Sequence, residues 1–238
     1  MLDSPRSSRR LAAFGLIAGP LLYLVSFVLQ PSWSDDTATY LSGVAANQGQ
    51  HAAWAGFFAL GALVLLPGLL GVARLLRGSR GSLGRVGAIA FGLSAVMIGG
   101  LVLAIAVTEI AMVAPAAEAA QMGALYDRTE ELTFATVVFG VLWFGGFVLG
   151  TLALAVGLVL RRVVTLLSPL LLVVWLGTMF FFDGRSGTIV GCALLVAAFA
   201  PLARRIATLE DEEWARWQPL PDEAAEYAPA GARAGAHA

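Results

Sequence analysis

The sequence predicts an all-α, polytopic membrane bundle with six transmembrane helices. Residues 132–160 form an uncharged run between Glu131 and Arg161, and this run exceeds the roughly 20 residues that an α-helix needs to cross about 30 Å of hydrocarbon. Only 13% of the 238 residues are charged and 58% are hydrophobic, whereas a soluble domain carries about 25% charged residues. The arginines also gather in alternate connections between the apolar runs, as the positive-inside rule requires of a multi-pass protein.

Residues 1–10 are short, polar and basic and precede the first apolar run. That run is too long for a signal peptide and is followed by no small-residue cleavage site, so we expect an uncleaved first span. The transmembrane domain is expected to cover residues 11–203. Its six spans are expected at residues 11–30, 51–72, 86–108, 132–160, 163–182 and 187–203.

Two polar connections on the outer face are expected to contain short surface helices. In the first connection, Ser34 can cap a helix with Asp35 and Asp36 in its first turn. Tyr40, Leu41 and Val44 then share one face, which predicts a helix lying along the membrane surface. In the third connection, between residues 110 and 131, apolar residues recur at helical spacing and predict a second surface helix.

The arginine distribution predicts that both termini are cytoplasmic. Only Arg128 and Arg185 fall on the outer side of the six-span scheme. The arginines on the inner side are Arg6, Arg9, Arg10, Arg74, Arg77, Arg80, Arg85, Arg161, Arg162, Arg204 and Arg205. All fifteen basic residues are arginine, which together with the load of Ala, Gly, Leu and Val suggests a bacterial chain and hence a bacterial cytoplasmic membrane.

Residues 204–238 are expected to form a cytoplasmic and mostly disordered tail. One or two helical turns can form near its start, but after Pro219 the chain consists largely of proline, alanine, glycine and acidic residues. Such a composition cannot bury enough apolar surface to fold.

Glycine pairs at four-residue spacing predict where the helices approach closely, because helices in lipid associate through small residues. The pairs are Gly15 with Gly19, Gly146 with Gly150, and Gly187 with Gly191. We expect these faces to pack within one chain, and a homo-oligomer formed through them is the alternative.

The candidate functional residues lie at the outer ends of spans two, three and four. They are His51, Glu109, Glu130 and Glu131. If these helices are neighbours, His51 and Glu109 can form an outward-facing ligand or proton site, because a histidine and a carboxylate can exchange protons or hold a metal. The competing interpretation is a solvated rim of mixed charge.

Other chemistry is not indicated. There is no phosphate-binding loop, no His-x-x-x-His pair and no nucleophile elbow, so we assign no catalytic residue, cofactor or metal. The net charge of −1 gives no reason to expect a nucleic-acid partner. The single cysteine, Cys192, excludes an intramolecular disulfide.

The sequence favours a non-enzymatic integral membrane protein with a structural or accessory role, with the lipid bilayer as its partner. One alternative is a small-molecule or ion transporter or channel, which a water-filled path to mid-membrane would favour. A second is an enzyme acting on a lipid or quinone at the outer face, which a lipid-facing cavity would favour.

Two segments carry a resemblance to a known family. Residues 36–47, with the sequence DTATYLSGVAAN, and the Leu-Leu-Arg of residues 75–77 resemble a broad family of small, largely actinobacterial, six-helix membrane proteins. These proteins are known only as a domain of unknown function. The likeness covers roughly residues 8–203 and implies the fold and the compartment, but no active site.

Overall fold

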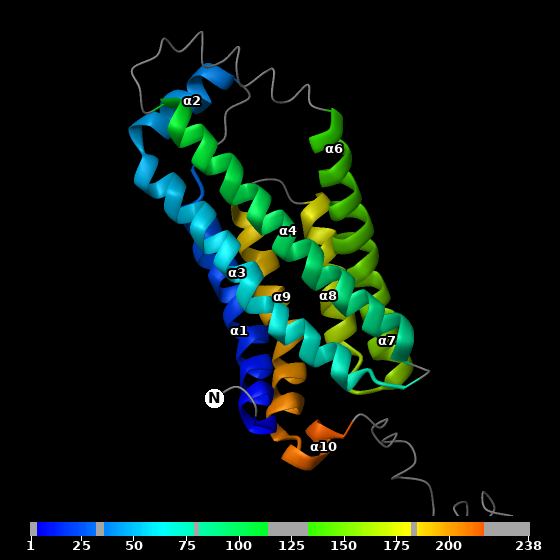
Figure 1. Ribbon diagram of the computed structural model, residues 1–238. Helices are drawn as coiled ribbons and strands as arrows, with labels where there is room; N and C mark the ends of the chain where they lie inside the picture. Colours follow the sequence, from blue (N-terminus) through cyan, green and yellow to red (C-terminus); the bar gives the residue numbers. More distant parts are fainter. Residues whose placement is uncertain (1–3, 32–35, 79–80, 114–132, 182–184, 217–238) are drawn as a thin grey trace, which may run out of the picture.

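The computed structural model describes residues 4–31, 36–78, 81–113, 133–181 and 185–216. Every regular element in these ranges is a helix (Figure 1). The elements are α1 (Pro5–Leu29), α2 (Thr37–Ala46), α3 (Gln48–Leu75), α4 (Ser82–Val113), α6 (Thr133–Gly140), the π-helix η2 (Val141–Leu149), α7 (Gly150–Arg161), α8 (Leu167–Phe181), α9 (Arg185–Thr208) and α10 (Asp211–Ala215). The all-α class predicted from the sequence is confirmed for these residues.

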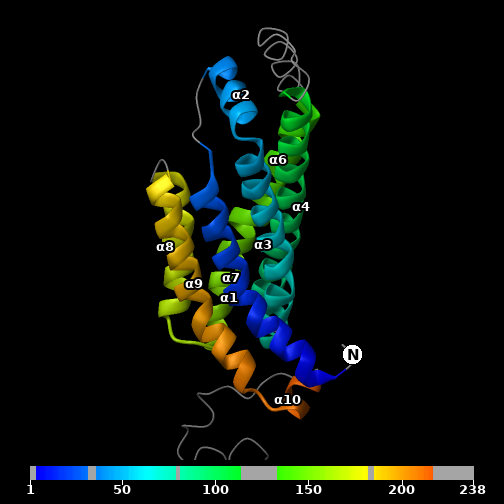
Figure 2. The ribbon, with the colours of Figure 1, turned by 90° about the vertical axis from the view of Figure 1, so that its left-hand side faces the viewer.

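The long helices run up and down and form a closed ring in chain order. α1 packs on α3, α3 on α4, α4 on η2 and α7, α7 on α8, α8 on α9, and α9 returns to α1 (Figures 1 and 2). α2 lies at one end of this ring and α10 at the other. We refer to these as the α2 end and the α10 end.

Five helical segments are long and apolar enough to cross a membrane. They are α1, α3, α4, the continuous segment Val137–Arg161, and Ser186–Thr208 in α9. The fifth span expected from the sequence corresponds to α8, which has 15 residues and is therefore about 22 Å long at 1.5 Å per residue. That is shorter than the hydrocarbon layer of about 30 Å, so a sixth crossing stays a prediction.

The third and fourth spans differ from their expected form. α4 begins at Ser82 and ends at Val113, so it extends past both ends of the expected range 86–108. Glu109 therefore lies inside the helix instead of just beyond it. The fourth span is continuous, but nine of its residues adopt the π-helix η2, a geometry that single-sequence periodicity does not reveal.

The expected helix of the first connection is present as α2, although Asp36 caps it instead of Ser34. The Asp36 carboxylate accepts hydrogen bonds from the backbone N–H and the hydroxyl of Thr39, at 2.8 and 2.5 Å. The apolar face of α2 packs against Val113 and Ile110 of α4. α2 is therefore docked on the end of α4. The surface helix expected in the third connection lies outside the described residues.

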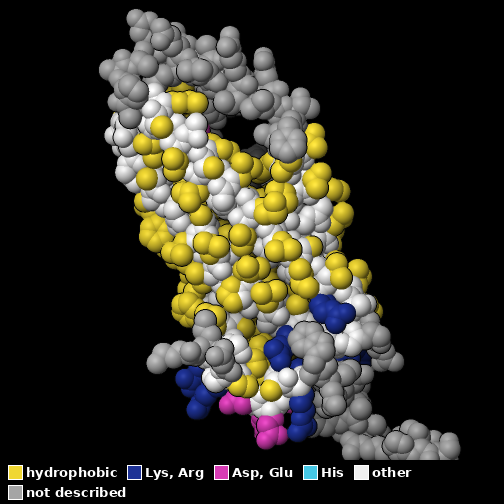
Figure 3. Space-filling view, viewed as in Figure 1, with side chains coloured by type: hydrophobic (Ala, Val, Ile, Leu, Met, Phe, Trp, Pro, Cys, Tyr) yellow, Lys and Arg dark blue, Asp and Glu magenta, His cyan; other side chains and the backbone are white. Residues whose placement is uncertain are grey.

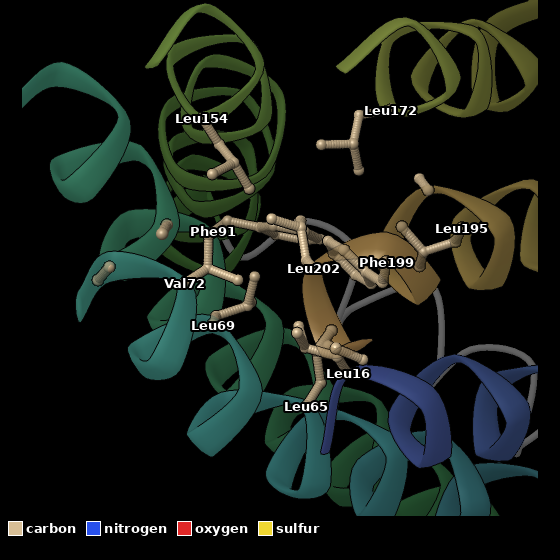
Figure 4. Close-up of a cluster of buried hydrophobic side chains, with 14 of the residues drawn as sticks. Leu16, Leu65, Leu69, Val72, Phe91, Leu154, Leu172, Leu195, Phe199 and Leu202 are labelled. Atoms are coloured by element: carbon tan, nitrogen blue, oxygen red, sulfur yellow. The ribbon is translucent and has the colours of Figure 1, made fainter. Parts of the chain in front are cut away.

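The centre of the ring is filled by apolar side chains from every long helix except α6. Leu16, Leu65, Phe91, Leu154 and Phe199 meet there (Figure 4). Apolar side chains also cover the outer surface between the two ends, while arginines gather at the α10 end (Figure 3). An apolar exterior together with an apolar interior is what a helical bundle in lipid requires.

Glycines let neighbouring helices approach to backbone contact. A Cβ atom added at Gly15 would overlap the backbone of α3, and one added at Gly157 would overlap Gly84 of α4. Gly150 and Gly146 make the same kind of close contact with α4, and together with Gly157 they form a row that we call the glycine seam. The first and fourth spans thus use their glycine pairs within one chain, as small residues do in membrane bundles.

The beginning of the expected tail is ordered. Residues 204–208 continue α9, and α10 packs against α1. Trp214 is buried, its indole N–H donates to the Ser8 hydroxyl at 2.9 Å, and the guanidinium of Arg74 lies 4.9 Å from its ring centroid. These contacts of Trp214 hold α10 against the bundle, although composition alone predicts that this segment belongs to the tail. Residues 217–238 lie outside the described part of the chain.

Candidate functional site

A buried polar network joins three helices at the α2 end. Glu109 of α4 lies between His51 of α3 and Tyr40 of α2. The His51 Nε2 atom is 2.6 Å from Glu109 Oε2, and the Tyr40 hydroxyl is 3.1 and 3.2 Å from the two carboxylate oxygens. The exposed fraction is only 0% for His51, 2% for Glu109 and 5% for Tyr40. Ionisable side chains this well buried in an apolar bundle are expensive and usually functional.

The local fold explains why these side chains meet. α2 ends at Ala46 and α3 begins at Gln48, so the chain turns within one residue and places His51 in the first turn of α3. α3 and α4 are packed neighbours that run in opposite directions. The added turn of α4 beyond residue 108 brings Glu109 level with His51, and α2 covers the pair.

The hydrogen bonds of the network define the roles of its atoms. The Glu109 carboxylate accepts from the Tyr40 O–H and, in the tautomer with a proton on Nε2, from His51. The Nδ1 atom of His51 is buried and has no hydrogen-bond partner among the described residues. A lone pair at Nδ1 is the less costly state there, because an unpaired buried N–H donor would lose its full hydration.

A polar hollow adjoins the network from the α2 side. It has a volume of about 260 Å³. Its walls are Gln30, Pro31, Tyr40, Gly43, Val44, Asn47 and Gln50. Tyr40 belongs both to this wall and to the network, so its phenol separates the hollow from the Glu109 carboxylate. A proton entering from the hollow therefore meets Tyr40 first.

A packed layer closes the network on its other side. Trp54, Ala55 and Ala106 are buried together one turn further into the bundle. The Ser26 hydroxyl donates to the Trp54 carbonyl at 2.9 Å and ties α1 to this layer. Below it, residues 55–73 of α3 and residues 86–106 of α4 carry no charged side chain.

The sequence-predicted candidates are only partly brought together. His51 and Glu109 are in direct contact, whereas Glu130 and Glu131 lie outside the described residues. Within the described chain no three His, Cys, Asp or Glu side chains cluster as a metal site would require. Tyr40 is the member that sequence reasoning placed on an apolar face and did not assign to the site. Its signal was a polar hydroxyl on an otherwise apolar helix face.

These features define an all-α bundle with membrane-length apolar helices and a buried ionisable network at one end. Comparison of the chain with models of protein families, with curated proteins and with solved structures gave no match. Function has to be inferred from the geometry of the chain itself.

Proposed function

We propose that this chain is a multi-pass, non-enzymatic accessory protein of a bacterial cytoplasmic membrane that responds to protons on the outer side. In this proposal α8 supplies the sixth crossing, both termini are cytoplasmic and the α2 end faces outward. The Tyr40–Glu109–His51 network binds the proton. The contact of 2.6 Å between His51 and Glu109, buried beneath α2, is the observation that carries the proposal.

The enclosure of the network favours a proton over a larger ligand. All three side chains are nearly inaccessible, so a molecule larger than water could reach the carboxylate only if α2 moved. A single imidazole and a single carboxylate also offer too few ligands for a stable metal site. Histidine is the side chain whose charge commonly changes between about pH 5 and 8, and His51 is in direct contact with the Glu109 carboxylate.

Proton binding is coupled to the docking of α2 through Tyr40. With a carboxylate at Glu109, the Tyr40 hydrogen bond is charge-assisted, and such bonds are roughly twice as strong as neutral ones. A proton on either Glu109 or His51 raises the net charge of the pair from −1 to zero and weakens that bond. Since α2 otherwise holds the bundle through a small apolar cluster, a weaker Tyr40 bond loosens the whole helix.

A second candidate function, transport, receives less support from the structure. A transporter needs a polar path, or at least a site near mid-membrane. The centre of the ring is instead filled by apolar side chains such as Leu65, Phe91 and Phe199. An outward-facing switch needs no such path, because the proton enters and leaves on the same side.

The proposal can be tested by measuring the position of α2 as a function of pH. Ala45 on α2 and Ala104 on α4 are both exposed, and spin labels at these positions in a Cys192→Ala chain report the distance between the helices. We expect a narrow distance distribution near pH 8 that broadens toward about pH 5. Glu109→Gln should give a distribution that no longer depends on pH.

The control addresses the other titratable groups near α2. Of the described residues of α1 to α4, the only other acidic side chain is Asp36 at the start of α2. Asp36→Asn should keep the response between about pH 5 and 8, because the hydrogen bonds from Thr39 hold the pKa of Asp36 below its ordinary value. A full pH response in Glu109→Gln would contradict the proposed switch.

The proposed orientation has a separate test. Ser42 on α2 and Ala207 on α9 are exposed at opposite ends of the bundle. In the Cys192→Ala chain, a cysteine at residue 42 should react with a membrane-impermeant maleimide in intact cells, and one at residue 207 should react only after lysis. The reverse pattern would place the network in the cytoplasm.

A further inference from the structure

A second site lies inside the ring, in the half of the bundle nearer the α2 end. It is a cavity of about 270 Å³ to which α1, α3, α4, α6, η2, α8 and α9 all contribute. Its lining is almost entirely apolar and rich in aromatic rings. The seven large aromatic side chains are Tyr23, Phe27, Phe58, Phe139, Trp143, Phe147 and Trp175.

The end of the glycine seam explains why a cavity opens here. Gly84, Gly87 and Ser94 of α4 lie against Gly157, Gly150 and Gly146 in turn, so α4 stays in close contact with the fourth span up to Gly146. Beyond Gly146 the fourth span turns large aromatic side chains toward α4 instead of glycines. The helices must then separate.

The separated helices leave a lateral opening. α4 packs on η2 and α7, and α6 has no comparable contact with it. The two diverge toward the α2 end, and the molecular surface is hollowed between them (Figures 1 and 3). Phe139 and Val102 line the cavity from the two sides of this gap. The exposed neighbours Val137, Val141 and Phe144 on the fourth span are apolar, so the opening lies on a lipid-facing surface.

The aromatic wall is held in a fixed arrangement. Phe139, Trp143 and Phe147 stack in sequence, with interplanar angles of 9° and 12°. Phe147 also contacts Phe91 edge-on and Trp175 at a tilt. Two of the stacked rings belong to the π-helix η2, and π-helical insertions are rare and concentrate at functional sites. The wall is therefore organised before any ligand arrives.

The apolar lining of the cavity determines which kind of molecule can occupy it. A water molecule in a cavity needs two to four polar partners, and apolar cavities either stay dry or take an apolar molecule. A second helix is about 10–12 Å across and is too wide to enter. A single hydrocarbon chain fits, because an apolar cavity of about 150 Å³ already takes a molecule such as benzene, and this cavity has a volume of about 270 Å³.

We propose that this cavity binds a single hydrocarbon chain of a membrane lipid, which enters from the surrounding leaflet between α4 and α6. The chain lies against the Phe139–Trp143–Phe147 wall and ends near Cys192 and Leu195 of α9. The Trp54, Ala55 and Ala106 layer separates it from the Tyr40–Glu109–His51 network. The lipid site is thus a separate function from the proton switch, and either can fail without the other.

The test uses photo-crosslinking in bilayers. The full chain is reconstituted with a phosphatidylcholine that carries a diazirine near the middle of one acyl chain, and labelled residues are mapped by mass spectrometry. Trp175, Cys192 and Leu195 line the cavity and are at most 3% exposed, so lipid on the outer surface cannot label them. We expect labels at these residues, and we expect excess decane to remove most of them.

A matched pair of variants locates the binding. Ile98→Trp fills the cavity from α4, because Ile98 is 4% exposed and belongs to its lining. Met97→Trp adds the same ring at the adjacent position, which is 53% exposed. Labelling of Trp175, Cys192 and Leu195 should fall several-fold in Ile98→Trp and persist in Met97→Trp.

Two results would overturn the proposal. One is labelling of the native chain that is confined to surface residues such as Val141 and Phe144. The other is labelling of the cavity residues that decane does not reduce. Decane competition uses the native chain, so the conclusion does not depend on the folding of Ile98→Trp.

Discussion

The hydrogen bond between Tyr40 and Glu109 can be measured with a double-mutant cycle. Tyr40→Phe removes only the hydroxyl that links α2 to the carboxylate. Hydrogen bonds to charged groups contribute about 1.5–3 kcal/mol, but this one is 3.1–3.2 Å long, beyond the usual 2.5–3.0 Å for O–H···O. Hydrogen bonds within membrane bundles average about 0.6 kcal/mol. We therefore expect a coupling of about 0.6–1.5 kcal/mol between Tyr40 and Glu109.

The assay is thermal unfolding in detergent at about pH 8, compared among the native chain, Tyr40→Phe, Glu109→Gln and the double variant. For a chain of this size, 1 kcal/mol shifts the melting temperature by about 2–4 °C, so Tyr40→Phe should lower it by about 1–6 °C. Ser42→Ala on the exposed face of the same helix removes only a local bond to the Thr39 carbonyl and should shift it by less.

The decisive quantity is the effect of Tyr40→Phe in the Glu109→Gln background. A neutral amide accepts a weaker hydrogen bond than a carboxylate, so the loss should shrink to about half or less of its value in the native chain. An equal loss in both backgrounds would show that Tyr40 stabilises α2 by packing alone. The proposed coupling between the proton and α2 would then have no physical basis.

Three further predictions use the same melting assay. Gly157→Ala should cost about 1–3 kcal/mol, because the new methyl group overlaps α4, whereas Gly145→Ala meets nothing within 4 Å and should be neutral or stabilising. Trp214→Ala should cost about 3 kcal/mol through lost burial; Glu212→Ala, which removes an exposed ion pair, should cost little. Finally, the hydrogen bonds at the start of α2 hold the pKa of Asp36 below its usual value. The resulting stability is present above the ordinary pKa and is lost as the pH falls through the lowered one, so Asp36→Asn should lack this acid-side component.

The fold was predictable to the extent that it depends on hydropathy. Long uncharged apolar runs have few alternatives to a helix in lipid, and five of the expected spans correspond to membrane-length helices. The end of α4 was missed because Glu109 looked like a stop signal, whereas its charge is accommodated by partners from α2 and α3. The docking of Trp214 was missed for the same reason, since its partners are about 140 and 200 residues away in sequence.

The candidate site was predictable only as a pair. Their positions in the sequence place His51 and Glu109 at the same depth in the membrane, at the outer ends of spans two and three. The contact between α3 and α4 was predictable from the short connection between them. Tyr40 could not be assigned, because its contact depends on the way α2 folds back onto α4. The aromatic cavity was also out of reach of the sequence. It depends on where the glycine seam ends and on the π-helix, and neither leaves a hydropathy signal.

The Tyr40–Glu109–His51 network and the aromatic cavity both include side chains of α3 and α4. The two sites could therefore act together through these helices. His51, Trp54 and Phe58 follow one face of α3, so the network, the packed layer and the cavity wall occur within seven residues, or about 10 Å at 1.5 Å per residue. Coupling across that distance requires an element with two discrete arrangements that both sites bias. The layer of Trp54, Ala55 and Ala106 is small and well buried. Because the Ser26 hydroxyl also ties α1 to this layer, a displacement of α3 could pass through the layer only if all of its residues moved together. α2, in contrast, contributes no residue to that layer. We therefore expect the proposed proton switch and the proposed lipid site to act independently.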